Sequence, residues 1–168
     1  KTTQLAAVVA EQEEIWAGDR SAVRLKRVAA NADRLGLASM NDMATGAAKL
    51  WERRHRWRES FHRILIDAPC SGLGTLARHP DARWRVTPQS IRGLLPQQQA
   101  LLDGLLPLLA PQGVLVYATC TIHPDENQKQ IHALLKRQPT LRLEQESQLW
   151  PDQASGGDGF YSAVLQRA

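Results

Sequence analysis

Two short apolar runs, residues 61–66 and 114–118, each lead into a turn that holds a cysteine. Short apolar runs rich in β-branched residues predict buried strands. Cys70 and Cys120, the two cysteines of the chain, therefore fall at the carboxyl ends of two predicted strands. In an open α/β sheet, that edge is where ligands bind. The pattern predicts thiol chemistry on a bound ligand.

A simpler interpretation exists for each cysteine alone. Free cysteines are commonly small buried core residues. Taken alone, either cysteine is explained by core packing at least as well as by a functional role. The first turn, however, also holds Asp67 and Pro69 next to Cys70, followed by a Ser-Gly pair. Two thiols at one sheet edge with an adjacent carboxylate favour a functional site over core packing.

Strand-like and helix-like segments alternate along the chain, which predicts βαβ units and a mostly parallel sheet. Gly36 predicts the end of the second helix. The expected helices cover residues 1–10, 21–35, 90–109 and 123–137, and the expected strands cover residues 14–17, 38–40, 61–66, 114–118, 141–143 and 160–165. The predicted fold class is α/β.

Composition restricts the functional classes. The 168 residues suffice for one domain with a real core, and 21 basic against 17 acidic residues fit a polyanionic partner. Two cysteines without Cys-x-x-Cys spacing are too few for a disulfide framework or a thiolate zinc site, so we expect no metal and a reduced, cytoplasmic protein. No apolar run is long enough to span a bilayer, and nothing indicates an obligate dimer, so we expect a monomer without a membrane role.

Four ordered blocks of the sequence point to a family. They read Asp-Ala-Pro-Cys-Ser-Gly-Leu-Gly at 67–74, Arg-His-Pro-Asp at 78–81 with Trp84, Tyr-Ala-Thr-Cys-Thr at 117–121 followed by Pro-Asp-Glu-Asn at 124–127, and Gly-Asp-Gly-Phe-Tyr at 157–161. The chain resembles the RNA cytosine-C5 methyltransferases of the Sun/Fmu type, most closely those that act on bacterial small-subunit ribosomal RNA.

The resemblance implies a Rossmann-like class I S-adenosylmethionine-dependent methyltransferase fold. In the family, the donor-binding block reads roughly Ala-Ala-Pro-Gly-Gly-Lys-Thr, and only its last two residues match here, as Lys1 and Thr2. We therefore expect residues 1–168 to be the carboxyl-terminal part of the catalytic domain, truncated before the first strand and the glycine-rich loop and lacking the RNA-binding domain. The missing strand would lie between those ending at Asp19 and Asp67.

The resemblance also implies a reaction, the methylation of cytosine C5 in small-subunit (16S) ribosomal RNA. Cytosine C5 is a poor nucleophile, so a thiolate must first add to C6, and a thiol suits this role because it attacks readily and later leaves. By similarity to the family, Cys120 is the nucleophile and Cys70 assists the elimination. Asp67 is expected to hydrogen-bond the base edge and favour protonation at N3.

The expected cofactor is S-adenosyl-L-methionine. Asp19 follows the second strand, where an acidic residue binds ribose hydroxyls. Resemblance adds Asp42 near the adenine, Asp67 at the catalytic turn and Lys1 at the donor loop. The partner implied is small-subunit ribosomal RNA, whose target base must be unstacked to reach the pocket. The residues expected near this substrate are Pro69, Arg78 and His79.

For two further features, the sequence allows both a structural and a functional interpretation. The Arg, His and Trp cluster at residues 51–58 is a packed helix face more readily than an RNA contact, because aromatic residues at this spacing usually pack inward. Glu126 and Asn127 follow the second cysteine, where helix capping and support of the catalytic loop are as well founded as a substrate contact.

Two other functions compete with the RNA methyltransferase. In a DNA cytosine methyltransferase the Pro-Cys turn would carry the nucleophile, so Cys70 and Cys120 would exchange roles. The block around Thr119 and the Pro-x-Glu-Asn segment after it argue against this. A non-catalytic RNA-binding fragment would keep the basic surface but would not hold the donor.

Overall fold

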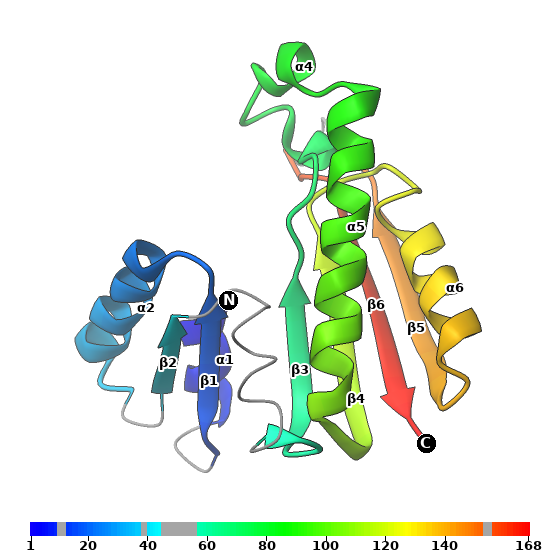
Figure 1. The fold of residues 1–168 in the computed structure, drawn as a ribbon. Coiled ribbons are helices and arrows are strands. Elements are labelled where there is room, and N and C mark those ends of the chain that lie inside the picture. Colours follow the sequence, from blue (N-terminus) through cyan, green and yellow to red (C-terminus); the bar gives the residue numbers. More distant parts are fainter. Residues whose placement is uncertain (10–12, 38–39, 45–56, 153–155) are drawn as a thin grey trace. The chain divides into compact units, whose positions relative to one another are not determined.

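The computed structural model describes residues 1–9, 13–37, 40–44, 57–152 and 156–168 (Figure 1), with residues 42–44 described by their backbone alone. Contacts within the chain divide it into two compact units, Lys1–Arg53 and Arg54–Ala168. Among the described residues, no helix has the length and apolar character needed to cross a membrane.

The first unit holds a parallel strand pair and two helices. In chain order these are α1 (Thr2–Val9), β1 (Ile15–Asp19), α2 (Ala22–Leu35) and β2 (Met40–Ala44). The side chain of Ser21 caps α2 by accepting a hydrogen bond from the backbone N–H of Arg24, and Gly36 ends the helix at a φ of 67°. Only glycine adopts that left-handed conformation at no steric cost, so the predicted end of the helix is confirmed.

One strand of the first unit begins further along the sequence than predicted. The expected strand at residues 38–40 is β2 at Met40–Ala44 instead, while residues 38–39 lie outside the described chain. Asp42 therefore lies within the strand, opposite Ala17 of β1, and not in the turn after it. The strand propensity of an Asn-Asp pair is low, but pairing with the partly buried β1 overrides it.

The second unit is a four-stranded mixed sheet with helices. Its strand order is β3-β4-β6-β5, in which β3 pairs parallel with β4 and the other two pairings are antiparallel. The prediction of parallel pairing is thus correct for β1–β2 and β3–β4 and wrong for the last two strands. The elements are β3 (Phe61–Asp67), η1 (Leu73–Thr75), α4 (Ala82–Arg85), α5 (Pro88–Leu105), η2 (Leu106–Leu108), β4 (Leu109–Thr119), α6 (Gln128–Arg137), β5 (Leu141–Leu149) and β6 (Phe160–Arg167).

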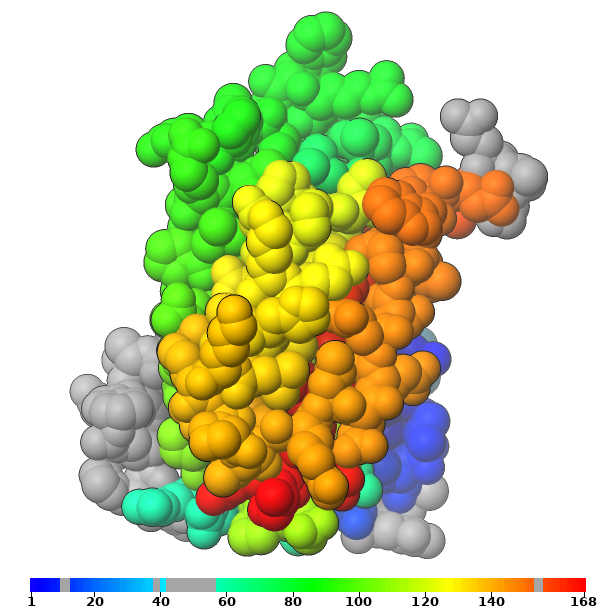
Figure 2. Space-filling model, turned by 90° about the vertical axis from the view of Figure 1, so that its right-hand side faces the viewer, coloured from blue at the N-terminus to red at the C-terminus, as the bar shows by residue number. Residues whose placement is uncertain are grey.

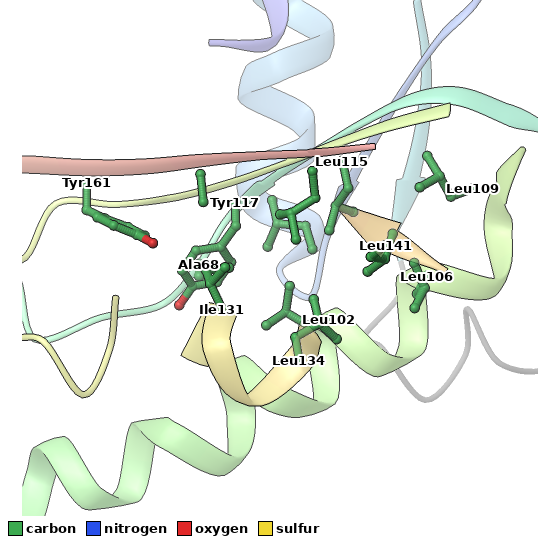
Figure 3. Packing of buried hydrophobic residues seen from close by; sticks show 13 residues of the cluster. Ala68, Leu102, Leu106, Leu109, Leu115, Tyr117, Ile131, Leu134, Leu141 and Tyr161 are labelled. Carbon is green, nitrogen blue, oxygen red and sulfur yellow. The ribbon is translucent and has the colours of Figure 1, made fainter. Parts of the chain in front are cut away.

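Helices α5 and α6 cover one face of this sheet and bury its core. Figure 3 shows Leu102 of α5 and Ile131 and Leu134 of α6 pointing toward Leu115 and Tyr117 of β4. All five side chains are fully buried. In Figure 2, α6 (yellow) and β5 (orange) lie side by side. Because α5 connects two neighbouring parallel strands, this packing fixes the ends of β3 and β4 relative to each other.

Several element boundaries differ from those predicted, among them the starts of α5, β4 and α6 and the end of β5, which reaches Leu149 instead of residue 143. Helix α5 begins two residues earlier because Thr87 and Ser90 form a reciprocal capping box. Strand β4 begins at Leu109, which pairs with Phe61, and residues 110–113 make an excursion before the ladder resumes. Helix α6 begins five residues later than expected, at Gln128.

The basic aromatic cluster at residues 51–58 falls mostly outside the described chain. Of its tryptophans, Trp57 is described, and its ring meets Phe61 edge-on, with centroids 6.2 Å apart and an interplanar angle of 81°. This contact agrees with inward packing of Trp57.

Candidate active site

The two cysteines meet at the carboxyl ends of β3 and β4. Asp67 at the end of β3 lies opposite Ala118, and the N–H of Ala68 donates a 2.9 Å hydrogen bond to the Ala118 carbonyl. The loops that follow therefore leave the same sheet edge. The Sγ atoms of Cys70 and Cys120 are 3.5 Å apart, and both residues are half-buried. The two thiols thus lie together, as the sequence predicts.

The surroundings of Cys70 change the pKa of its thiol. A hydrogen bond to Cys120, burial, and the charge of Cys120 when ionised all raise the pKa of Cys70 well above that of an ordinary thiol. Two negative charges at this distance would repel each other in a partly desolvated site. Ionisation of both thiols at once is therefore disfavoured, and the pKa of Cys70 lies above that of an ordinary thiol.

This raised pKa gives a prediction for stability against pH. Above 9.0, the ordinary pKa of a thiol, the unfolded chain releases a proton that folded Cys70 retains. The unfolded state then binds fewer protons than the folded state, so the free energy of unfolding should fall as the pH rises. Urea titrations below and above that pH should show a shallower fall for Cys70→Ala, and equal slopes for the two proteins would contradict this.

A buried carboxylate joins the two cysteine loops. Glu126 is fully buried, and its Oε1 accepts hydrogen bonds from the Ser71 backbone N–H (2.8 Å) and from Gln98 Nε2 (3.1 Å). Its Oε2 accepts from Ser71 Oγ (2.5 Å) and Thr121 Oγ1 (3.2 Å). Ser71 and Thr121 each directly follow one of the cysteines. The carboxylate therefore fixes the position of one loop against the other.

Asn127 extends this network toward the end of β4. Its Oδ1 accepts a 2.6 Å hydrogen bond from Thr119 Oγ1, and its Nδ2 donates to the Thr121 carbonyl (2.9 Å) and to Gln148 Oε1 (3.0 Å). Asn127 occupies the N-cap position of α6 but makes no capping bond with its side chain. Among the alternatives left open by the sequence, the structure supports the role of Glu126 and Asn127 in holding the catalytic loops.

Gln98 was not predicted from the sequence as part of the site. This fully buried side chain of α5 donates to the Pro69 carbonyl (2.9 Å) and to Glu126, so it ties the helix to the first loop. One signal was available, because Gln98 shares helical spacing with the apolar Ile91 and Leu102. A glutamine on the buried face of a helix must find hydrogen-bond partners inside the protein.

Two glycines let three backbone segments approach closely, at Gly74, Cys120 and Gly159. The N–H of Gly74 donates to the Cys120 carbonyl (3.0 Å), and the N–H of Gly159 donates to the Gly74 carbonyl (2.7 Å). A Cβ atom on Gly74 would lie 2.1 Å from the Gly159 carbonyl oxygen and 2.9 Å from that of Cys120. The blocks at 67–74, 117–121 and 157–161 therefore meet at one point.

Gly74→Ala should destabilise the protein and separate the two cysteine loops. The added methyl group meets backbone atoms that have no free rotation to relieve the clash, so we expect a loss of about 1–3 kcal/mol or more. Gly93→Ala is the matched control because an added Cβ on Gly93 in α5 meets no atom within 4 Å. Alanine there should raise stability by about 0.5–1 kcal/mol. Urea unfolding of both variants measures the contrast, and similar midpoints would contradict it.

The other predicted site residues of this unit lie before and after Cys70 in the sequence, and they differ in their contacts. Asp67 is an exposed residue at the end of β3, and Pro69 is exposed with its carbonyl bound by the α5 glutamine. Arg78 forms an ion pair with Asp158, and His79 is exposed. Arg78 thus binds the loop before β6, and the RNA contacts of Arg78 and His79 stay predictions.

The predicted donor-binding residues Lys1, Asp19 and Asp42 belong to the first unit. Asp19 ends β1, and its Oδ1 accepts a 2.7 Å hydrogen bond from the Ser21 N–H while its Oδ2 pairs with Arg24 at 3.3 Å. Lys1 directly precedes α1. Within the part of the chain that the structure describes, no group of three His, Cys, Asp or Glu residues could hold a metal ion.

Known proteins resemble this chain along nearly all of its length. A family model described as 16S rRNA methyltransferase RsmB/F matches residues 1–166. A probable ribosomal RNA small subunit methyltransferase B of Synechocystis sp. is 45% identical over 150 residues, which cover 86% of this chain and 32% of that protein. The ribosomal RNA small subunit methyltransferase B of Photorhabdus laumondii is 39% identical over 178 residues, covering 99% and 39%. The chain thus spans less than two fifths of the length of these relatives.

Solved structures share the fold. NSun6 from Pyrococcus horikoshii, solved with SFG, has a TM-score of 0.82 at 26% identity, covering 99% of this chain and 44% of that one. The N-methyltransferase NodS from Bradyrhizobium japonicum, in complex with S-adenosyl-l-homocysteine, has a TM-score of 0.56, covering 92% and 66%. At 14% identity, NodS shows the fold alone. The predicted Rossmann-like class I S-adenosylmethionine-dependent methyltransferase fold is confirmed.

Proposed function

The chain belongs to the RsmB/F family of 16S rRNA methyltransferases, and from this membership we propose that the protein methylates C5 of a cytosine in small-subunit ribosomal RNA through a covalent adduct with Cys120. The observation that carries the proposal is the 3.5 Å separation of the Cys70 and Cys120 sulfur atoms at the carboxyl ends of β3 and β4. We further predict that the protein is a monomer in the cytoplasm.

The residues present fit S-adenosylmethionine as the donor, which supplies an electrophilic methyl group. Asp19 places a partly exposed carboxylate at the carboxyl end of a parallel strand, where such a group accepts hydrogen bonds from ribose hydroxyls. Its bonds to Ser21 and Arg24 hold the carboxylate in place and leave acceptor capacity on its oxygens. Lys1, Asp42 and Asp67 complete the proposed donor set.

Cys120 acts as the nucleophile in this proposal. Its thiolate forms a bond to C6 of the cytosine, and the C5=C6 electron pair moves to C5, which becomes the atom able to accept a methyl group. Asp67, at the end of the neighbouring strand, would hydrogen-bond the base edge and favour protonation at N3, which makes C6 more electrophilic. Pro69 would border the base, and Arg78 and His79 would lie near the RNA backbone.

Cys70 acts in the release step. After methylation, C5 carries both a proton and the methyl group, and removal of that proton restores the C5=C6 double bond as the bond between C6 and the Cys120 sulfur breaks. Cys70 assists this elimination: as a neutral thiol 3.5 Å from the Cys120 sulfur, it donates its proton to that sulfur as the C6–sulfur bond breaks, while the C5 proton passes to a water molecule.

The test is the identity of the methylated nucleoside. The chain is incubated with small-subunit ribosomal RNA and S-adenosylmethionine that carries a tritium-labelled methyl group, and the RNA is digested to nucleosides and separated. We expect label in 5-methylcytidine, and none when Cys120→Ala replaces the wild-type chain. Label in another nucleoside, or 5-methylcytidine made by Cys120→Ala, would contradict the proposal.

A further inference from the structure

Helix α4 presents an aromatic side chain to solvent next to the active site. Figure 1 shows α4 beyond the carboxyl end of β3, the sheet edge from which the catalytic loops emerge. Trp84 in this helix is 88% exposed, the largest exposure among the large hydrophobic side chains of the described residues. An indole this exposed gains nothing from the core, and its ring is free to stack on a ligand.

Arginines flank this tryptophan in the sequence. The segment 78–92 contains arginines at positions 78, 83, 85 and 92 and one carboxylate, Asp81, which pairs with Arg85 at 2.7 Å. Arg83, the residue before Trp84, makes no side-chain hydrogen bond or ion pair with any residue that the structure describes. A cation beside an exposed ring is thus left available for an anionic partner.

A pocket continues from this helix toward the two cysteine loops. It has a volume of about 290 Å³ and an apolar wall formed by Leu73, Val86 and Ile91. Its polar residues include Arg92, His123 and the carboxylate Asp125, which is paired with Lys129. Val86 follows Trp84 by two residues, while Leu73 and His123 each lie three residues after a cysteine. Apolar walls with a cation and an imidazole suit a planar base attached to a phosphate.

We infer that Trp84, Arg83 and this pocket bind single-stranded RNA beside the target cytosine. A base adjoining the target stacks on Trp84, Arg83 contacts a phosphate, and a further unstacked base enters the pocket. Aromatic rings between cations are the usual surface for single-stranded nucleic acid. Protein interfaces are also rich in Trp and Arg, so the test includes arms that separate an RNA partner from a protein partner. The inference rests on the proposed function, because it assigns the RNA path at the same site.

The test is RNA affinity, measured by fluorescence anisotropy with a fluorescein-labelled single-stranded oligoribonucleotide. All variants carry Cys120→Ala and no donor is added, so binding is measured apart from chemistry. Trp84→Ala should weaken binding roughly ten-fold, and Trp84→Phe should restore most of it because a ring is kept. Trp150→Ala is the matched control, since Trp150 is also exposed, at 66%, but lies after β5. Arg83→Gln should reduce the salt dependence by roughly 0.7 in slope, and the exposed Arg142→Gln should not.

A second arm anneals the same oligoribonucleotide to its complement, and the effect of Trp84→Ala should disappear because paired bases are not free to stack on the ring. Equal affinities of Trp84→Ala and Trp150→Ala for the single strand, or no binding by the parent, would overturn the inference. So would a change in sedimentation of Trp84→Ala at unchanged RNA affinity, which indicates a protein partner. A separate Trp84→Ala variant, which keeps Cys120 and carries Cys70→Ala, tests the proposed function independently: an adduct formed at saturating RNA would support that function even if the RNA-binding inference failed.

Discussion

Cys70→Ala is expected to accumulate a covalent protein–RNA adduct, and Cys120→Ala is expected to form none. The first variant retains the nucleophile but loses the thiol that assists elimination, so the C6–sulfur bond forms and persists. The second variant lacks the atom that makes the bond. The measurement is a denaturing gel of each variant after incubation with small-subunit ribosomal RNA and S-adenosylmethionine, where the adduct migrates as a band of raised mass.

The double variant Cys70→Ala, Cys120→Ala controls for nonspecific crosslinking and should give no band. A band that requires Cys70 would reverse the two roles and match the arrangement of a DNA cytosine methyltransferase. The pair is a sensitive test because the sulfur atoms are 3.5 Å apart, so either one could reach a base held between them.

Glu126→Ala is expected to cost about 2–4 kcal/mol of stability, and to slow adduct formation about a hundred-fold. The change leaves the Ser71 N–H without its acceptor, and it leaves Gln98 Nε2 with the Pro69 carbonyl as its remaining acceptor. It also releases the two cysteine loops from each other, and small displacements of reacting groups cause large losses in rate. Urea unfolding measures the first effect, and the rate of adduct formation in the Cys70→Ala background measures the second.

Glu126→Gln should recover much of both losses. Its side-chain carbonyl can accept from the Ser71 N–H and Gln98 Nε2, while the hydroxyls of Ser71 and Thr121 can rotate to accept from the new amide. Glu144→Gln on β5 is the control for loss of a carboxylate, because Glu144 is exposed. If Glu126→Ala formed adduct at the wild-type rate, the network would have no part in positioning the thiols.

The sequence predicted the part of the site that depends on strand ends. Cys70 and Cys120 follow apolar runs, and parallel neighbours place their carboxyl ends at one edge, so the juxtaposition follows from local pattern and topology together. The two loops were also visible as separate blocks of sequence. Nothing in local pattern required the third segment, around Gly159, to lie against Gly74, because that contact depends on the antiparallel register of β6.

The parts that escaped prediction depend on tertiary contacts. The start of α6 moved from residue 123 to Gln128 because the preceding residues are committed to holding the loops, which helical periodicity does not register. Gln98 was missed because a glutamine on a helix is ordinarily solvated. Its inward orientation is stabilised by a hydrogen bond to the buried Glu126, which lies on a different part of the chain. Asp42 moved into a strand because pairing with β1 outweighed the local preference of its neighbours.

The thiol pair also links catalysis to folding. Its two members are 50 residues apart in the chain, and they meet only after β3, α5 and β4 have come together. Contacts between residues so far apart in the sequence form late in folding, because the intervening chain must lose conformational entropy before the contact can stabilise it. A partly folded chain therefore carries two separate thiols, and in the proposed mechanism the nucleophile Cys120 and its partner Cys70 come together only in molecules that have folded this unit. On this proposal, we expect chains that have not finished folding to form no covalent adduct with RNA.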